Sequence, residues 1–248
     1  GPRHAVVADS RQEDARLGRR EVADARPRVE DQRGRIGEHA VELQRAREIG
    51  LQKSVFTNSN GLPDPGTQVT TRELSILART IIRNYPDQYK IYGEREFTWN
   101  KIRQQNRNPL LGTLEGADGL KTGFTKDAGY GLVGSATQHG LRLIAVVNGL
   151  KSAKERADEG KKLLEWGFRN FEQRPLFAEG QTIGAAKVYG GANGRVPLVA
   201  GGQVRVMLPK SGAERLIARI VYKGPVPAPI TAGQPIGVLK VWRSNNVI

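Results

Sequence analysis

The sequence predicts an α+β protein: an antiparallel sheet with packed helices, followed by a small all-β sandwich-like domain. Helical periodicity occurs at residues 70–85 and again at 152–171. Between them, residues 130–148 alternate as two strands joined by a turn. After residue 174, short alternating runs are separated by Gly and Pro at a spacing typical of β-sandwiches. We therefore expect two domains, at 45–172 and 173–248.

Residues 1–44 differ in composition from the rest. Residues 1–50 contain 11 Arg and 10 Asp or Glu, but no Lys and none of the chain's 15 aromatic residues. Such a segment has too few large apolar groups to form a core of its own. We expect residues 1–44 to be either a solvated, partly helical arm or sequence foreign to the rest, such as the product of a misread frame.

The first helical signals follow this segment. Ala46, Ile49 and Leu51 suit the end of a helix that is closed by Gly50. Residues 56–69 are rich in Asn, Gly and Pro and predict a loop. The next helix is predicted to begin with a capping box formed by Thr70 and Glu73 and to end before Pro86. Its apolar face would contain Leu74, Leu77, Ala78 and Ile81.

A hairpin pattern in the sequence predicts two strands of the central sheet. Tyr130 to Thr137 and Leu141 to Asn148 alternate as strands, with a turn over residues 138–140. Residues 152–171 then place apolar side chains near one stripe of a helix, so we expect this helix to pack over the hairpin. The stripe contains Ala153, Ala157, Leu164, Phe168 and Phe171.

The formal net charge of +14 raises the question of nucleic-acid binding. However, the charge is spread: residues 51–248 carry 28 basic and 15 acidic side chains without a block of five like charges. We therefore favour a basic protein that works beside an anionic wall polymer or membrane surface over a nucleic-acid binder.

Other classes of site are disfavoured. The sequence has no Cys, and His4, His39 and His139 lack metal-ligand spacing, so we expect no metal and no cofactor. No apolar run is long enough to span a bilayer, and no secretory leader opens the chain.

The candidate site is the tripeptide Lys121, Thr122 and Gly123 before the hairpin. A site for a peptide that ends in a carboxylate needs a cation and a hydroxyl to hold that group. Gly123 would let a second chain approach without a Cβ in the way. At the start of an edge strand, the three residues would line a groove to which an extended peptide adds as a further strand. The alternative is an exposed turn before a strand.

Several stretches in order carry a family resemblance: "NSNGLPDPG", "REFTWNKIRQQNRN", "ADGLKTGFT", "AGYGLVGSAT" and "EWGFRNFE". Over residues 45–248 the chain resembles the low-molecular-mass penicillin-binding proteins, which are serine D-alanyl-D-alanine carboxypeptidases. The resemblance implies that residues 45–172 are part of a penicillin-binding, β-lactamase-like transpeptidase domain. Residues 173–248 would be a truncated C-terminal β domain.

The resemblance also implies an activity. A serine attacks the carbonyl between two terminal D-alanines of a peptidoglycan stem peptide, D-alanine leaves, and water hydrolyses the acyl-enzyme to release the shortened peptide. Lys121 would belong to the polar network around that serine, and Thr122 with Thr125 would bind the terminal carboxylate beside Gly123. The N–H of Phe124 would complete an oxyanion hole.

The remaining implications concern a further residue, the partners and the location. Arg107, in "QNRN", matches a family arginine near the groove; alternatively it is a surface arginine that ties a loop to the sheet. The expected partners are stem peptides that end in D-Ala-D-Ala, with β-lactams as inhibitors and no nucleic acid. The expected location is the bacterial periplasm or envelope, with membrane-surface association through a helix beyond Ile248.

Two family motifs do not occur where they are expected. No serine has Lys three positions later, so the S-x-x-K nucleophile would lie ahead of Gly1. Gly18, Arg19 and Arg20 stand where S-x-N should fall, and the literal match at residues 244–246 is interpreted as chance. We therefore expect this chain itself to hydrolyse almost nothing, and we keep a non-catalytic peptidoglycan- or partner-binding protein of the envelope as the alternative.

Overall fold

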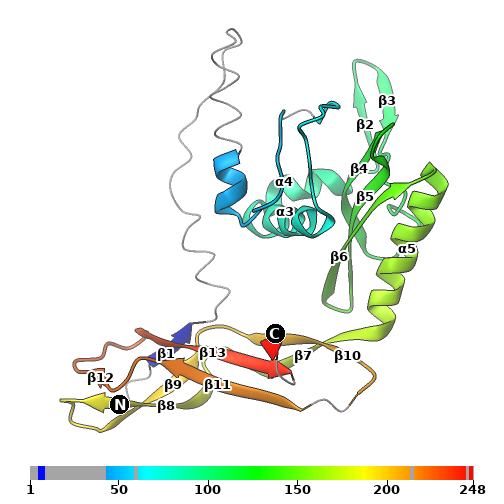
Figure 1. The fold of residues 1–248 in the computed structure, drawn as a ribbon. Helices are drawn as coiled ribbons and strands as arrows, with labels where there is room; N and C mark the ends of the chain where they lie inside the picture. Colours follow the sequence, from blue (N-terminus) through cyan, green and yellow to red (C-terminus); the bar gives the residue numbers. More distant parts are fainter. Residues whose placement is uncertain (1–4, 9–42, 59–60, 213–214, 244–245, 248) are drawn as a thin grey trace. The chain divides into compact units, whose positions relative to one another are not determined.

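The computed structural model describes residues 5–8, 43–58, 61–212, 215–243 and 246–247. These residues form two compact units. The first unit contains the described residues from 43 to Arg169, and the second contains residues 5–8 and those from Asn170 onward. Figure 1 shows helices and a small sheet in the first unit and mostly strands in the second. The α+β prediction is confirmed.

The first unit alternates short helices with strands. Residues 43–48 are helical and end as expected, because Gly50 has φ of +91° and the N–H of Leu51 donates to the carbonyl of Ala46 at 2.9 Å. The following elements are α3 (Thr71–Asn84), α4 (Pro86–Tyr89), the 3-10 helix η1 (Lys90–Gly93), β2 (Glu96–Trp99), β3 (Ile102–Gln105), β4 (Ala117–Thr125), β5 (Gly129–Gln138), β6 (Leu141–Leu150) and α5 (Ala153–Asn170).

The capping box predicted for α3 is only half formed. The hydroxyl of Thr70 accepts the N–H of Glu73 at 3.1 Å, as expected. The carboxylate of Glu73 does not return to residue 70 but accepts the backbone N–H groups of Gln52 and Lys53, both at 2.8 Å, and of Ser54, at 2.6 Å. Glu73 is only 6% exposed. Glu73 therefore holds the loop that follows residue 50 against the first turn of α3.

The central sheet has the strand order β4-β5-β6, and both pairings are antiparallel. The predicted hairpin is confirmed, with a tighter turn than expected, because Gln138 pairs directly with Leu141. The two turn residues, His139 and Gly140, have φ of +48° and +77°, as a two-residue hairpin requires.

α5 packs on this hairpin, as predicted. Leu164, 1% exposed, lies in one core cluster with Leu132 of β5, and Leu143 of β6 packs against that cluster. Gly160 permits the close approach, since a Cβ there would lie 2.6 Å from Leu132. The predicted inclusion of Phe171 in the helix is wrong: Phe171 begins β7, where it pairs with Pro209 of a distant strand.

The second unit is built from short strands, as the alternating runs predicted. They are β1 (Ala5–Ala8), β7 (Phe171–Phe177), β8 (Thr182–Tyr189), β9 (Arg195–Ala200), β10 (Val204–Pro209), β11 (Leu216–Tyr222), β12 (Val226–Pro227), β13 (Pro235–Arg243) and β14 (Asn246–Val247). One sheet has the order β11-β13-β1-β9-β8-β12, with β14 on β13, and a second sheet pairs β10 with β7.

β1 was not expected, because residues 1–44 showed no strand signal. Its four residues, AVVA, pair in parallel with β13 and β9, so the strand depends on partners that lie about two hundred positions away in the sequence. The rest of the anomalous segment up to residue 42 lies outside the described residues.

The core of the second unit is formed by strands distant in sequence. Ala186, Val196, Leu198 and Val226 form its main buried cluster, against which Ile220 of β11 and Leu239 of β13 pack. Side chains next to Ile220 and Leu239 in their strands therefore point away from this core.

The buried carboxylate of Glu73 gives a testable acid dependence. Ser54 and the N–H groups of residues 52–54 lower the pKa of Glu73 below its usual 4.5. Its stabilising contribution should be complete above that pH and be lost as the pH falls through the lower, folded-state value. Glu73→Gln should therefore lower the free energy of unfolding at about pH 7, with a smaller deficit near pH 3, measured by urea denaturation. Glu94→Gln, at an exposed site, is the control, and an equal loss at both pH values would contradict the assignment.

Candidate functional site

The tripeptide Lys121, Thr122 and Gly123 lies in the second half of β4, not at its start as predicted. Asp118, Gly119 and the glycines around them favour a loop locally, but pairing with β5 extends the strand back to Ala117. In the described part of the chain β4 pairs only with β5, so no second strand covers its other edge. The expected edge-strand position of the tripeptide is thus present.

Lys121 and Thr122 point to opposite faces of the sheet, since successive strand residues alternate. Lys121 is in register with Val133, which packs against the cluster that contains Ala78 of α3. Thr122, 8% exposed, is in register with Leu132 in the cluster beneath α5. Lys121 is therefore on an exposed face of β4, whereas Thr122 is on the buried face.

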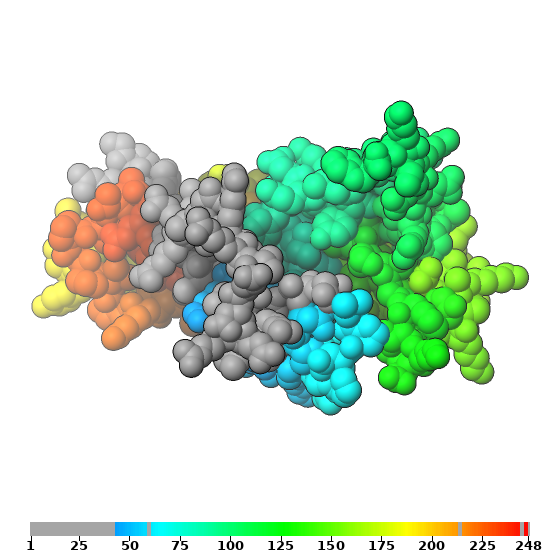
Figure 2. Space-filling view, turned by 90° about the horizontal axis from the view of Figure 1, so that it is seen from above, coloured from blue at the N-terminus to red at the C-terminus, as the bar shows by residue number. Residues whose placement is uncertain are grey.

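The surroundings of the tripeptide leave that edge accessible. Lys121 is exposed, and its Nζ donates to the carbonyl of Thr122 at 2.7 Å. At Gly123 a Cβ would meet nothing within 4 Å, which places open space beside the strand. Figure 2 shows side chains of the green segment around residue 125 at the surface of the first unit.

The other predicted residues have different environments. Phe124 is 55% exposed, and its ring centre lies 4.3 Å from that of Tyr130. The hydroxyl of Thr125 accepts the N–H of Ala128 at 3.0 Å and so also supports the turn between β4 and β5. Arg107 is exposed after β3, and no hydrogen bond or ion pair joins its side chain to β4 in the structure as described.

Arg156 is a residue that the sequence analysis missed. It lies in the first turns of α5, its Nη1 is 3.5 Å from the carbonyl oxygen of Gly123, and its guanidinium lies 5.6 Å from the centre of the Tyr130 ring. Its buried Nε has no partner among the described residues. A cation is unfavourable at the N-terminal end of a helix, and this was the available signal for its role.

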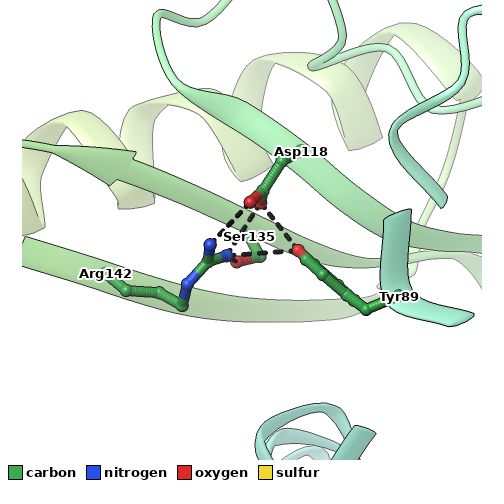
Figure 3. Close-up of polar contacts among 4 residues, drawn as sticks. All are labelled: Tyr89, Asp118, Ser135 and Arg142. Carbon is green, nitrogen blue, oxygen red and sulfur yellow. Dashed lines mark hydrogen bonds and ion pairs between the residues drawn. The ribbon is translucent and has the colours of Figure 1, made fainter. Parts of the chain in front are cut away.

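A second missed feature is a polar network at the base of β4 (Figure 3). Arg142 of β6 donates to both carboxylate oxygens of Asp118, at 2.9 and 2.7 Å, and to the hydroxyl of Ser135 on β5 at 2.7 Å. Tyr89 of α4 donates to Asp118 at 2.6 Å. The network therefore joins all three strands to α4, three residues before Lys121.

The network alters the ionisation of its tyrosine. Burial, together with the hydrogen bond to Asp118, raises the pKa of Tyr89 from 10.0 to about 12. The hydrogen bonds and charge of Asp118 raise the pKa of Arg142, which stays a cation at every accessible pH. Around neutral pH, Tyr89 is therefore a neutral phenol and Arg142 a cation.

Across the described residues there is no group of three or more His, Cys, Asp or Glu that could hold a metal, and His139 lies in the turn between β5 and β6. The helices that the structure describes include none long and apolar enough to span a bilayer. His4, His39, Gly18, Arg19 and Arg20 lie outside the described residues, as do Ser244 and Asn245 of the literal S-x-N match.

Comparisons with known families match both units. Residues 41–152 match the family described as D-alanyl-D-alanine carboxypeptidase, and residues 171–248 match the C-terminal domain of penicillin-binding protein 5. An antiparallel sheet with K-T-G on its edge strand, together with this β domain, defines the class as the penicillin-binding proteins. Within that class, the chain belongs to the D-alanyl-D-alanine carboxypeptidase family.

Individual members of this family are similar to the chain in sequence and structure. The chain is similar to D-alanyl-D-alanine carboxypeptidases of Haemophilus influenzae, at 42% identity over 77% of this chain and 49% of the relative, and of Escherichia coli, at 40% over 78% and 49%. Penicillin-binding protein 5 from Haemophilus influenzae is similar in structure, with a TM-score of 0.72 and 39% identity over 84% of this chain and 62% of that one. The chain thus spans about half the length of these curated relatives.

Breaking the network at the base of β4 should destabilise the first unit. Asp118→Asn removes the carboxylate that receives both bonds from Arg142 and should lower the free energy of unfolding by about 2 kcal/mol, measured by urea denaturation. Arg103→Gln removes an exposed pair with Glu96 and should change it by less than about 1 kcal/mol. Equal effects of the two substitutions would contradict the structural role of the network.

The raised pKa of Tyr89 can be measured directly. Its stabilising contribution is complete below pH 10.0 and is lost as the pH rises through about 12, because the neutral phenol is the favoured form in the folded state. In a pH titration followed by phenolate absorbance, one tyrosine should ionise only near pH 12, and Tyr89→Phe should remove that step. Tyr189→Phe, at a site 73% exposed, should leave that step in place, and its loss there would refute the assignment.

Proposed function

We propose that this chain carries the K-T-G part of a serine-type D-alanyl-D-alanine carboxypeptidase site, which removes the terminal D-alanine from peptidoglycan stem peptides through an acyl-enzyme. The observation that carries the proposal is the free edge of β4, with Lys121 and Thr122 on either side of it and open space at Gly123. Membership in the family supports it. β-Lactams would act as inhibitors, and the working location would be the bacterial envelope or periplasm.

The geometry suggests how the peptide would be held. An extended stem peptide adds along the free edge of β4 through backbone hydrogen bonds. Its terminal carboxylate would meet the ammonium of Lys121 and the hydroxyl of Thr122. Thr125 accepts a hydrogen bond from the backbone but keeps its own hydroxyl proton available to donate.

Arg156 adds a second cation to this edge. Its guanidinium lies beside Gly123, and its positive charge would attract the carboxylate of the peptide. Arg107 would contribute at the outer side of the groove. The backbone N–H of Phe124 would serve as an oxyanion donor, a role worth on the order of 10²–10³ in rate at comparable sites.

The attacking serine is a separate question, because no serine among the 248 residues has Lys three positions later. This favours, as the second candidate, a non-catalytic protein of the envelope that binds peptidoglycan or a partner through the same edge. In either case we expect the 248-residue chain to bind the peptide without forming an acyl-enzyme.

Binding can be tested on this chain by backbone-amide NMR with an N-acetylated peptide ending in D-Ala-D-Ala. Signals of residues 121–125 should shift, and Lys121→Gln should weaken binding about tenfold, because a charge-assisted hydrogen bond is lost. Lys126→Gln, an equal charge change at the end of the same strand, should alter it less than about twofold. Unchanged β4 signals, or equal binding of the peptide with an amidated C-terminus, would refute the proposed edge site.

Labelled penicillin separates the two candidates. This chain should retain no covalent label, and retention would show that it supplies a nucleophile of its own. Labelling of the intact gene's product would support the carboxypeptidase. Absence of labelling on that product, with D-Ala-D-Ala binding preserved, would support the binder.

A further inference from the structure

The second unit carries an excess of positive charge. Residues 170–248 contain ten Lys and Arg residues but only three Glu and no Asp. The excess does not depend on K-T-G, which lies in the other unit. It therefore calls for an explanation separate from the peptide site.

Two cross-strand positions concentrate this charge. Arg219 of β11 lies directly opposite Lys240 of β13, and Lys187 of β8 lies directly opposite Arg195 of β9. Like charges in direct register destabilise a sheet. Arg219 and Lys240 are both exposed, and neither forms an ion pair or hydrogen bond with a residue that the structure describes. No opposite charge among the described residues therefore offsets their mutual repulsion.

The pair belongs to a mixed surface that we call the outer β11–β13 face. Because Ile220 and Leu239 pack in the core, their strand neighbours Arg219 and Lys240 point outward. Alternation and register place apolar side chains on the same face. The outer β11–β13 face consists of Ile217, Arg219, Val221, Val238, Lys240, Trp242 and, from the paired strand β14, Val247.

Three of its apolar members are exposed, whereas Val238 and Trp242 are half-buried. Ile217 is 36% exposed, Val221 46% and Val247 59%. The guanidinium of Arg219 lies 5.7 Å from the centre of the Trp242 ring, so the cation and the aromatic ring form one contiguous patch. Figure 1 shows β11 and β13 side by side. β14 pairs with the last residues of β13, where Val247 lies opposite Trp242.

This combination identifies the kind of partner. A soluble polyanion would neutralise Arg219 and Lys240 but would leave the valines and Ile217 in water. An anionic bilayer surface satisfies both, since headgroup phosphates meet the cations while apolar and Trp side chains enter the boundary with the acyl chains. We propose that the outer β11–β13 face docks on anionic phospholipid membranes.

The first test is sedimentation of this chain with vesicles. It should bind phosphatidylglycerol–phosphatidylcholine vesicles at low salt, bind phosphatidylcholine vesicles far less, and dissociate as salt rises. Arg219→Gln with Lys240→Gln should weaken partitioning about 10- to 30-fold, as expected for two basic residues near an anionic surface. The matched control, Lys187→Gln with Arg195→Gln, removes the same charge from the other opposed pair and should change it less than about threefold.

Three outcomes would overturn the proposal. They are the absence of binding to anionic vesicles, equal losses in the two double variants, and binding of soluble heparin with the same affinity and the same sensitivity to both variants. Equal losses would assign binding to net charge, and the heparin result would assign it to a general polyanion site.

Two further measurements test which face meets the membrane and whether the variants remain folded. With Trp99→Phe and Trp166→Phe, only Trp242 remains, and brominated lipid should quench it in the anionic vesicles. Lys240→Gln should keep or raise the thermal unfolding midpoint, because it relieves the repulsion from Arg219. Unquenched Trp242 in the bound state would exclude this face.

Discussion

The antiparallel pairing of β4 with β5 is the interaction on which the candidate site depends. It sets Lys121 opposite Val133 and Thr122 opposite Leu132, so one register decides which side chain faces each side of the sheet. A slip of one residue would exchange those faces. The register is held at its base by Asp118, which Arg142 contacts through both carboxylate oxygens and which Tyr89 joins to α4. A fork of this kind resists sliding, because both bonds must break together.

The two units differ in how their sheets are covered. In the first, α5 covers one face of the sheet at close range, while one edge of β4 is left without a partner strand among the described residues. In the second, opposed cations and exposed apolar side chains weaken the isolated sheet. Exposed apolar patches of this kind are where we expect a protein to interact with another molecule or with a membrane.

Local sequence was a good guide wherever neighbouring residues make the decision. Gly50 ended a helix, Thr70 capped the next one, and the alternation after residue 130 gave the hairpin. Predictions from local sequence were wrong where residues distant in the sequence make the deciding contact. Glu73 was predicted to complete its own cap, but backbone donors at residues 52–54 take its carboxylate. Phe171 continued the periodicity of a helix, yet pairing with Pro209 makes it a strand residue.

The sequence by itself determined the α+β class, the family and the Lys-Thr-Gly tripeptide, because periodicity and motif order are written in consecutive residues. Only the tertiary structure decided that the tripeptide lies in the second half of its strand and that Arg156, 33 positions after Gly123, lies beside that glycine. The same holds for the Asp118 network, whose members come from four separate elements. Contacts of this length depend on the summed packing of the strands and helices between them, which no local pattern encodes.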